Sequence, residues 1–248
     1  MRCGVSCLSG LDAVILAGGQ GSRLRQVWAN RPKIMAPVRG EPLLKYLISQ
    51  LREAGIRRVV LSLGYLADIV QQYIAENSWD DMEIVTVVEP SSLGTGGGLR
   101  YAASSLRSST VLVMNGDSLN KIQLCELLTF HQRKAARASL LLTAVERADR
   151  YAVVETDAED HITTYNNQSP ATNATNGPAH ISAGVYLMER SLISSWPEKE
   201  AFSLERDVFP QMCGQGLYGL KRRFPFLDIG TPEAYRSAEA FVQQYAWA

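Results

Sequence analysis

Short apolar runs alternate with amphipathic stretches along the chain up to about residue 150. The apolar runs are rich in β-branched residues and predict strands, whereas apolar positions spaced three and four residues apart predict helices. The predicted strands span 12–17, 58–63, 83–88, 110–114 and 139–145, and the predicted helices span 42–54, 66–76, a glycine-opened stretch ending at Ser104, and 122–136. Strands that alternate with helices indicate an α/β fold, with a mostly parallel sheet and helices on both faces.

The pattern changes after about residue 150, where strands are no longer followed by long helices. The further predicted strands span 151–156, 161–165 and 180–188. Between the last two, the segment NNQSPATNATNGP (166–178) has the composition of a surface loop or hairpin tip. Near the end, Thr231 followed by Pro232 is typical of a helix start, and the amphipathic run predicts a helix to Tyr245. We therefore expect a small β subregion joined to the α/β part.

Composition limits the partners of the chain. The 248 residues carry 25 Lys plus Arg and 25 Asp plus Glu, so the formal net charge is zero. Such a balance does not suggest a polybasic surface for nucleic acid or anionic lipid, and an anionic ligand must be met by local charges. The opening MRCGVSCLSG lacks the pattern of a secretory signal, and no run approaches the length of a membrane span. We expect a cytoplasmic protein.

The four cysteines show no metal-site or redox motif. Cys3, Cys7, Cys125 and Cys213 form no CxxC pair and lie outside metal-ligand spacing of the three histidines. We therefore expect reduced, structural thiols, with Cys3 and Cys7 in an exposed N-terminal tail.

A glycine-rich stretch, LAGGQGSRL (16–24), follows the first predicted strand. Its position at the carboxyl end of a strand lets backbone N–H groups face a phosphate. Three readings compete: a dinucleotide site, a nucleoside triphosphate site, or a turn without a ligand. A dinucleotide fingerprint needs a third glycine where Leu24 stands, and an acidic ribose anchor is missing after the second predicted strand. A GxxxxGK[ST] string is absent as well.

What remains is a glycine turn that carries its own cation, Arg23, and is soon followed by Lys33 in the string Arg31-Pro32-Lys33. Arginine offers a fork of N–H groups for phosphate oxygens, and lysine offers a compact point charge. Asp117 follows the predicted strand 110–114 and so lies at the same edge of the sheet. A carboxylate there would repel a triphosphate unless a divalent cation joined the two.

These stretches together resemble the signature of the sugar-1-phosphate nucleotidyltransferases, the nucleotide-sugar pyrophosphorylases. The resemblance runs from Ala13 to the C-terminal helix and is closest in look to the guanylyltransferases acting on heptose 1-phosphate or mannose 1-phosphate, with muramate-type uridylyltransferases close behind. The matching strings are LAGGQGSRL, RPKIMAPVRGEPLL, LGTGGGL (93–99), NGDS (115–118), SAGVYLM (182–188), SLERDVFP (203–210) and FLDIGTPEAY (226–235).

The resemblance implies a Rossmann-like nucleotide-diphospho-sugar transferase fold in one domain, 1–248. Residues of about 11–150 would form the nucleotide-binding half, and about 151–248 would form the sugar-phosphate-binding half with the C-terminal helix. The implied reaction joins a nucleoside triphosphate to a sugar 1-phosphate, giving the NDP-sugar and pyrophosphate. GTP with D-glycero-D-manno-heptose 1-phosphate or mannose 1-phosphate is the expected pair. The alternatives are a uridylyl-, cytidylyl- or thymidylyltransferase acting on another sugar 1-phosphate, and a catalytically silent regulatory relative. A monomer and a homodimer both fit.

The resemblance also assigns roles to residues, residue by residue. The catalytic residues, which would act by positioning and charge stabilisation, are Arg23, Lys33 and Asp117. The residues that would bind Mg²⁺ are Asp117 and Asp228. The nucleotide-binding residues would be Leu16, Ala17, Gly18, Gly19, Gly21, Ser22, Arg23, Lys33, Gly94, Thr95, Gly96, Asn115 and Gly116. The sugar-binding residues would be Gly97, Gly184, Tyr186 and Glu205.

Two positions depart from the family pattern. A Glu-Lys pair is usual after the strand corresponding to 161–165, where this chain has Asn167-Gln168. The usual Asn before Ala-Gly is Ser182. We expect Lys221, Arg222 or Arg223, clustered just before Asp228, to supply the missing positive charge.

Overall fold

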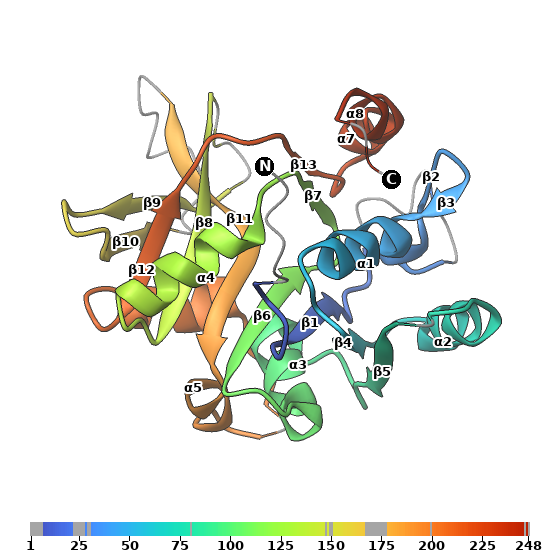
Figure 1. The fold of residues 1–248 in the computed structure, drawn as a ribbon, viewed down its shortest axis with the longest axis horizontal. Coiled ribbons are helices and arrows are strands. Elements are labelled where there is room, and N and C mark those ends of the chain that lie inside the picture. Colours follow the sequence, from blue (N-terminus) through green and yellow to red (C-terminus); the bar gives the residue numbers. More distant parts are fainter. Residues whose placement is uncertain are drawn as a thin grey trace.

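A computed structural model describes residues 7–21, 28, 31–79, 81–146, 148, 151–166, 178–198, 200–245 and 247. The strands of the first part alternate with helices as the hydrophobic pattern predicts (Figure 1). In chain order they are β1 (Asp12–Ala17), β2 (Pro37–Val38), β3 (Glu41–Pro42), α1 (Leu43–Glu53), β4 (Arg58–Leu63), α2 (Ala67–Glu76), β5 (Glu83–Val88), α3 (Gly94–Ala102), β6 (Thr110–Asn115), β7 (Ser118–Asn120), α4 (Leu124–Arg133) and β8 (Ala138–Val145).

The second part is richer in strands, as expected, and adds short helices. Its elements are β9 (Val153–Thr156), β10 (Ile162–Asn166), β11 (Ala179–Glu189), α5 (Arg190–Ser194), a π-helical turn (Leu204–Val208), α6 (Phe209–Met212), β12 (Leu217–Lys221), β13 (Phe226–Asp228), α7 (Pro232–Arg236) and α8 (Ala238–Gln244). The predicted C-terminal helix is therefore two helices, which meet around Ser237.

One mixed sheet organises the molecule. Its strands follow the order β10-β9-β11-β6-β1-β4-β5, and β8 and β12 continue it beside β11. Strand β1 pairs in parallel with β4 and β6, and β4 pairs in parallel with β5, so the carboxyl ends of these four strands share one edge. Strand β11 runs antiparallel to β6 and continues past its carboxyl end to pair with β9. The predicted α/β, Rossmann-like class is confirmed, with an antiparallel β subregion on one side.

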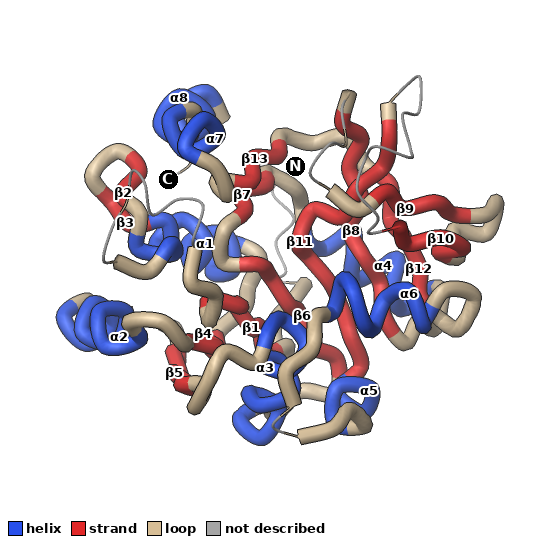
Figure 2. The backbone as a smooth tube through the Cα atoms, turned by 180° about the vertical axis from the view of Figure 1, so that it is seen from behind, coloured by secondary structure: helices blue, strands red, loops and turns tan. Residues whose placement is uncertain are grey.

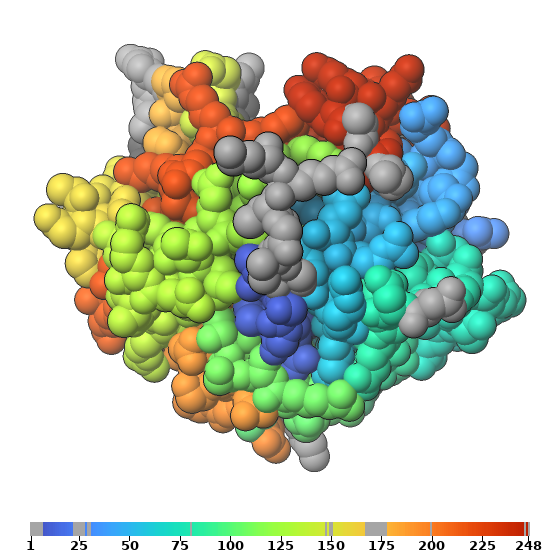
Figure 3. Space-filling model, in the orientation of Figure 1, coloured from blue at the N-terminus to red at the C-terminus, as the bar shows by residue number. Residues whose placement is uncertain are grey.

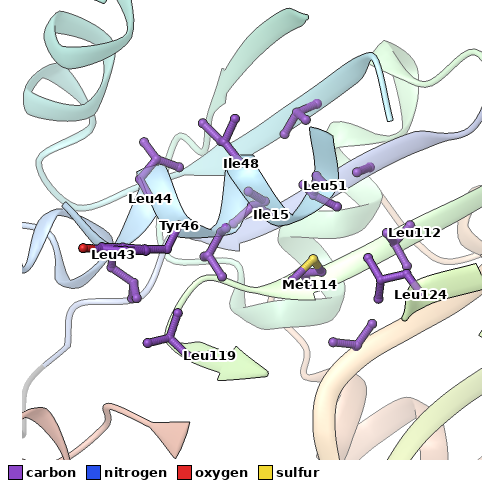
Figure 4. Close-up of a cluster of buried hydrophobic side chains, with 14 of the residues drawn as sticks. Ile15, Leu43, Leu44, Tyr46, Ile48, Leu51, Leu112, Met114, Leu119 and Leu124 are labelled. Carbon is purple, nitrogen blue, oxygen red and sulfur yellow. The ribbon is translucent and has the colours of Figure 1, made fainter. Parts of the chain in front are cut away.

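Helices cover both faces of the sheet. Figure 1 shows α1 and α4 on the near face, and Figure 2, from behind, shows α3, α5 and α6 on the other. Two separate groups of buried side chains correspond to these faces. The first includes Ile15, Leu51 of α1 and Leu124 of α4 (Figure 4), and Leu141 of β8 also belongs to it. The second includes Leu142 and Tyr186, with residues of α3, α5 and α6. Alternation of side chains along each strand therefore decides which layer a residue joins.

Residues 7–11, the described part of the chain before β1, pack against the rest of the fold. Leu8 is fully buried, and its N–H donates to the Ala54 carbonyl. Figure 3 shows this first described segment in dark blue between residues of α4 and α1. Here Cys7 and Cys125 form a disulfide, with their Cα atoms 5.7 Å apart. The expectation of reduced thiols is wrong for this pair, because 118 residues separate the two in sequence and spacing alone cannot reveal the contact.

Cys213 is a free, partly buried thiol, and Cys3 lies outside the described residues. No helix within the described ranges is long and apolar enough to cross a membrane.

Candidate active site

A cavity of about 310 Å³ opens at the carboxyl ends of the parallel strands. It extends from the end of β6 to the end of β5, across three strand spacings or about 14 Å. Most of the sequence-predicted nucleotide-binding residues line it. The lining residues are Leu16, Ala17, Gly18, Gly19, Gly21, Lys33, Ile34, Glu89, Ser92, Gly94, Thr95, Asn115, Gly116, Asp117 and Gly230. Two residues predicted to hold the triphosphate, Ser22 and Arg23, lie outside the described residues.

The glycine loop after β1 owes its composition to close packing. A Cβ on Gly18 would lie 2.3 Å from Oε1 of Glu89, and a Cβ on Gly116 would lie 2.8 Å from the Leu16 carbonyl oxygen. Gly21 has a φ of +57°, in the left-handed region that glycine adopts without strain. These glycines let the loop after β1 pack closely against Glu89 and against the end of β6.

Lys33 lies at one end of the cavity between two carboxylates. It begins the 3₁₀ turn Lys33–Met35, and its Nζ donates to Oδ2 of Asp117 at 2.7 Å. Oδ1 of Asp228, from the end of β13, lies 3.8 Å from the same Nζ. The Lys33 side chain is only 14% exposed. The predicted catalytic lysine and both predicted metal ligands therefore converge from three segments that are far apart in sequence.

The two aspartates match the needs of a Mg²⁺ ion. Among the residues that the structure describes, no group of three or more His, Cys, Asp or Glu side chains is arranged to hold a metal. Mg²⁺ bound beside phosphates needs only one or two carboxylates, and it keeps several waters. Both carboxylates converge on one cation already, because each lies within 4 Å of Lys33 Nζ. The donor set therefore fits a metal shared with phosphate oxygens.

The glycines at the start of α3 have two different environments. Gly94 lines the cavity beside Thr95. Gly96 and Gly97 instead donate their N–H groups to the Phe202 carbonyl, and a Cβ on Gly97 would lie 2.3 Å from the Glu200 carbonyl oxygen. Gly97, predicted to bind sugar, is thus buried against the 200–202 backbone. Close helix packing explains this glycine without a ligand.

Glu89 is a cavity residue that the sequence reasoning missed. It follows β5, is 8% exposed, and accepts hydrogen bonds from Ser62 Oγ at 3.1 Å and from the Leu93 N–H at 3.0 Å. Burial raises the pKa of this carboxyl group above its usual value. A Cβ on Gly98 would lie 2.5 Å from its Oε1, as for Gly18 on the other side. The available signal was an acidic residue directly after an apolar strand, the same signal that singled out Asp117.

A second group of polar side chains adjoins the cavity from the β subregion. Glu205 accepts hydrogen bonds from Thr95 Oγ1 at 2.7 Å and Ser203 Oγ at 2.8 Å through Oε2. The Tyr186 hydroxyl donates to Oε1 of Glu205 at 3.3 Å, and burial raises the pKa of that phenol well above its usual value. Glu205 thus connects the nucleotide side, through Thr95, with the predicted sugar side.

Gly184 brings β11 against the end of β6. Its φ is +70°, and a Cβ there would lie 3.0 Å from the Cβ of Asn115. The Ser182 hydroxyl lies 3.5 Å from the Tyr186 hydroxyl and 3.3 Å from the Gly184 nitrogen. The predicted sugar-binding residues Gly184, Tyr186 and Glu205 therefore lie together behind the lining residues Asn115 and Thr95, but none of the three lines the cavity itself, and Gly184 and Tyr186 are buried. Asn167 and Gln168, the site of the missing Glu-Lys pair, lie outside the described residues.

Comparisons with known proteins match this chain over most of its length. A family model described as nucleotidyl transferase matches residues 12–245. The mannose-1-phosphate guanylyltransferase of Mycobacterium tuberculosis is 36% identical over 91% of this chain, which spans 62% of that relative's length. The D-glycero-alpha-D-manno-heptose 1-phosphate guanylyltransferase of Aneurinibacillus thermoaerophilus is 30% identical over 95% of this chain and 100% of its own length.

Solved structures are similar as well. The crystal structure of HddC from Yersinia pseudotuberculosis has a TM-score of 0.82 and 28% identity, covering 93% of this chain and 98% of that chain. The same protein complexed with GMP-PN has a TM-score of 0.81.

Proposed function

Because this chain belongs to the nucleotidyl transferase family, we propose that it transfers a nucleoside monophosphate from a nucleoside triphosphate to a sugar 1-phosphate. The expected substrates are GTP and either D-glycero-D-manno-heptose 1-phosphate or mannose 1-phosphate, and the products are the GDP-sugar and pyrophosphate. The observation that carries the proposal is the convergence of Lys33, Asp117 and Asp228 at one end of a cavity whose other end holds Glu89.

The chemistry is a single displacement at phosphorus. An oxygen of the sugar 1-phosphate attacks the α-phosphorus, a new P–O bond forms, and the bond to the bridging β-phosphate oxygen breaks. Negative charge accumulates around the α-phosphate and the leaving pyrophosphate, so the protein contributes mainly positioning and charge stabilisation. Lys33 provides a fixed positive charge, Arg23 a second one, and the glycine loop the backbone N–H groups that face the phosphates.

A divalent cation, Mg²⁺ in this proposal, would be held by Asp117 and Asp228 and would neutralise phosphate charge when bound. In the structure, the Lys33 ammonium instead neutralises the negative charge of these two carboxylates. With phosphates bound, the Lys33 ammonium would pair with the α-phosphate, and Asp117 and Asp228 would hold the cation.

Glu89 supports guanine as the base. The Watson–Crick edge of guanine presents two adjacent donors, N1–H and the N2 amino group, and a carboxylate accepts from both. The two Glu89 oxygens each accept one hydrogen bond within the protein, and each keeps a second lone pair. Uracil and cytosine do not offer two adjacent donors at this edge. The position of Glu89, at the end of the cavity away from Asp117, suits a base whose phosphates lie at Lys33.

The β subregion would bind the acceptor sugar. Glu205, which is partly exposed, offers an acceptor for sugar hydroxyl groups, the buried Tyr186 hydroxyl holds its Oε1, and Gly184 lets β11 pack closely against Asn115. In this proposal, residues of about 11–150 bind the nucleotide and those of about 151–248 the sugar phosphate. All these groups come from one chain, so a monomer or a homodimer suffices. We place the reaction in the cytoplasm.

The test is a pyrophosphate-release screen of GTP, UTP, CTP and ATP with Mg²⁺ and a panel of sugar 1-phosphates. We expect turnover with GTP and a manno-configured sugar 1-phosphate. A Lys33→Met variant is the negative control. Turnover only with UTP or CTP would refute the guanine assignment. Tight nucleotide-sugar binding without turnover for any pair would favour a regulatory relative instead.

A further inference from the structure

Three consecutive basic residues, Lys221 at the end of β12 and Arg222 and Arg223 just after it, have side chains that divide between the two faces of the sheet. Arg222 pairs with Glu126 of α4, with Nε to Oε2 at 2.7 Å. Its predecessor Lys221 is in register with Leu142 of β8, whose side chain belongs to the buried group on the opposite face. Because side chains alternate along an extended chain, Lys221 and Arg223 lie away from α4.

His180 of β11 belongs to the same face as Lys221. It is in register with Ala144 of β8, two residues beyond the pair formed by Ser182 and Leu142. The positive charges of Lys221 and Arg223 both lower the pKa of the His180 imidazole, after burial, which is the largest cause. Both cations therefore lie near His180, and we call His180, Lys221 and Arg223 the cationic rim.

The cationic rim continues the surface that carries the proposed sugar-binding residues. Lys221, Leu142 and Ser182 lie in one register row, so Lys221 is two strand spacings, about 10 Å, from Ser182. A lysine side chain covers much of that gap. Figure 1 shows the segment after β12 crossing from β12 to β13, whose last residue is Asp228. The cationic rim thus lies between the sugar side of the cavity and the strand that carries Asp228.

The cations on this side of the site differ in the partners that the described residues offer them. Lys33 is already committed to Asp117 and Asp228. Lys221 and Arg223, in contrast, form no ion pair with any carboxylate of the described residues. The groups around Glu205 supply hydroxyl groups and a carboxylate to a sugar, and a sugar 1-phosphate also brings a phosphate monoester with two negative charges.

Building on the proposed function, we propose that the cationic rim of His180, Lys221 and Arg223 binds the phosphate monoester of the acceptor sugar 1-phosphate. Arg222, which the sequence could not separate from its neighbours, has no part in this subsite because it is engaged with Glu126 on the other face. Two long cations and an imidazole hold the phosphate by charge and hydrogen bonds without a fixed bidentate geometry.

The test compares a Lys221→Ala/Arg223→Ala double variant with Arg222→Ala, a matched control that removes one charge from the same segment. The double variant should raise KM for the sugar 1-phosphate by about 10- to 100-fold, the range expected when charged hydrogen-bond donors are lost. KM for GTP should change less than about twofold, and Arg222→Ala should behave like the wild type. Raising the salt concentration should increase KM for the sugar 1-phosphate less in the double variant, because fewer charges remain to be screened.

A charge-conserving variant, Lys221→Arg/Arg223→Lys, distinguishes loss of charge from a folding defect. It should restore most of the affinity for the sugar 1-phosphate. An unchanged KM for the sugar 1-phosphate in the double variant would overturn the cationic rim while leaving the proposed function intact. A KM increase in Arg222→Ala as large as in the double variant would also overturn it. Failure of the wild type to turn over any sugar 1-phosphate would overturn the proposed function itself and the subsite with it.

Discussion

Replacing Glu89 by Gln tests the nucleobase assignment with the smallest change in shape. The substitution keeps the size of the side chain and turns one acceptor oxygen into an NH₂ donor. Within the protein, that donor would face either the Ser62 hydroxyl or the Leu93 N–H, which now donate to the carboxylate. Toward guanine it would face N1–H or the N2 amino group. One of the two base contacts is lost whichever way the amide turns.

The magnitude follows from the burial of the carboxyl group. A hydrogen bond to a charged group contributes about 1.5–3 kcal/mol, and an opposed donor adds desolvation cost. We expect kcat/KM for GTP to fall by roughly 30- to 150-fold, which corresponds to about 2–3 kcal/mol. UTP should be affected far less, because an amide can donate to O4 and accept from N3–H. The decisive quantity is therefore the ratio of kcat/KM for GTP to that for UTP, which should fall in Glu89→Gln.

The assay is steady-state pyrophosphate release at saturating sugar 1-phosphate with GTP and with UTP. Glu83→Gln is the matched control, because Glu83 begins the same strand, has a side chain 46% exposed, and pairs with Arg107 and Arg58 outside the cavity. Thermal unfolding verifies that both variants fold. A kcat/KM for GTP within about threefold of the wild type, in a folded Glu89→Gln variant, would refute the reasoning.

Three further outcomes are expected. Lys33→Met should lower kcat by about 100-fold or more, because a positive charge that stabilises the transition state is lost. The same variant should bind Mn²⁺ more tightly than the wild type in calorimetry without nucleotide, because Asp117 and Asp228 lose the cation that pairs with them. An unchanged Mn²⁺ affinity would contradict this. The raised pKa of Glu89 means that kcat/KM for GTP should fall as pH drops through that pKa, since protonation removes an acceptor, and Glu89→Gln should abolish this limb of the profile. Reducing the Cys7–Cys125 disulfide should lower the melting temperature, with a chain-entropy upper bound of about 5 kcal/mol on the loss of stability. When the protein is unfolded without a reductant, a colorimetric reagent should detect only the thiols of Cys3 and Cys213, and reaction of all four cysteines would exclude the bond.

The hydrophobic pattern predicted the fold well where elements are long and periodic. Strand β1 and strand β4 have the predicted bounds, because buried parallel strands are continuous apolar runs between turns. Strand β12 was not predicted, since LYGLK is short and interrupted by glycine, and only its pairing with β8 makes it a strand. The C-terminal segment was predicted to be a single helix, because the spacing of its apolar residues gives no sign of the break at Ser237 between α7 and α8.

The site could be predicted in part. Residues in recognisable strings, such as Lys33 and Asp228, meet in the structure although 195 positions separate their numbers. Glu89 and the cationic rim depend on which strands become neighbours and which face a side chain takes, and a single sequence does not record either. The same limit applies to Gly97. In the sequence it cannot be distinguished from a ligand-binding glycine, whereas in the structure it packs against the 200–202 backbone.

The hydrogen bond from Thr95 to Glu205 has a thermodynamic consequence for how the binding of one substrate affects the affinity for the other. Thr95 lines the cavity, and Glu205 adjoins the proposed sugar side, so a ligand that engages either residue changes what the other can bind. Linkage then requires reciprocity: the factor by which nucleotide alters affinity for sugar phosphate equals the factor by which sugar phosphate alters affinity for nucleotide. We therefore expect the 2.7 Å contact between Thr95 and Glu205 to couple the two proposed half-sites.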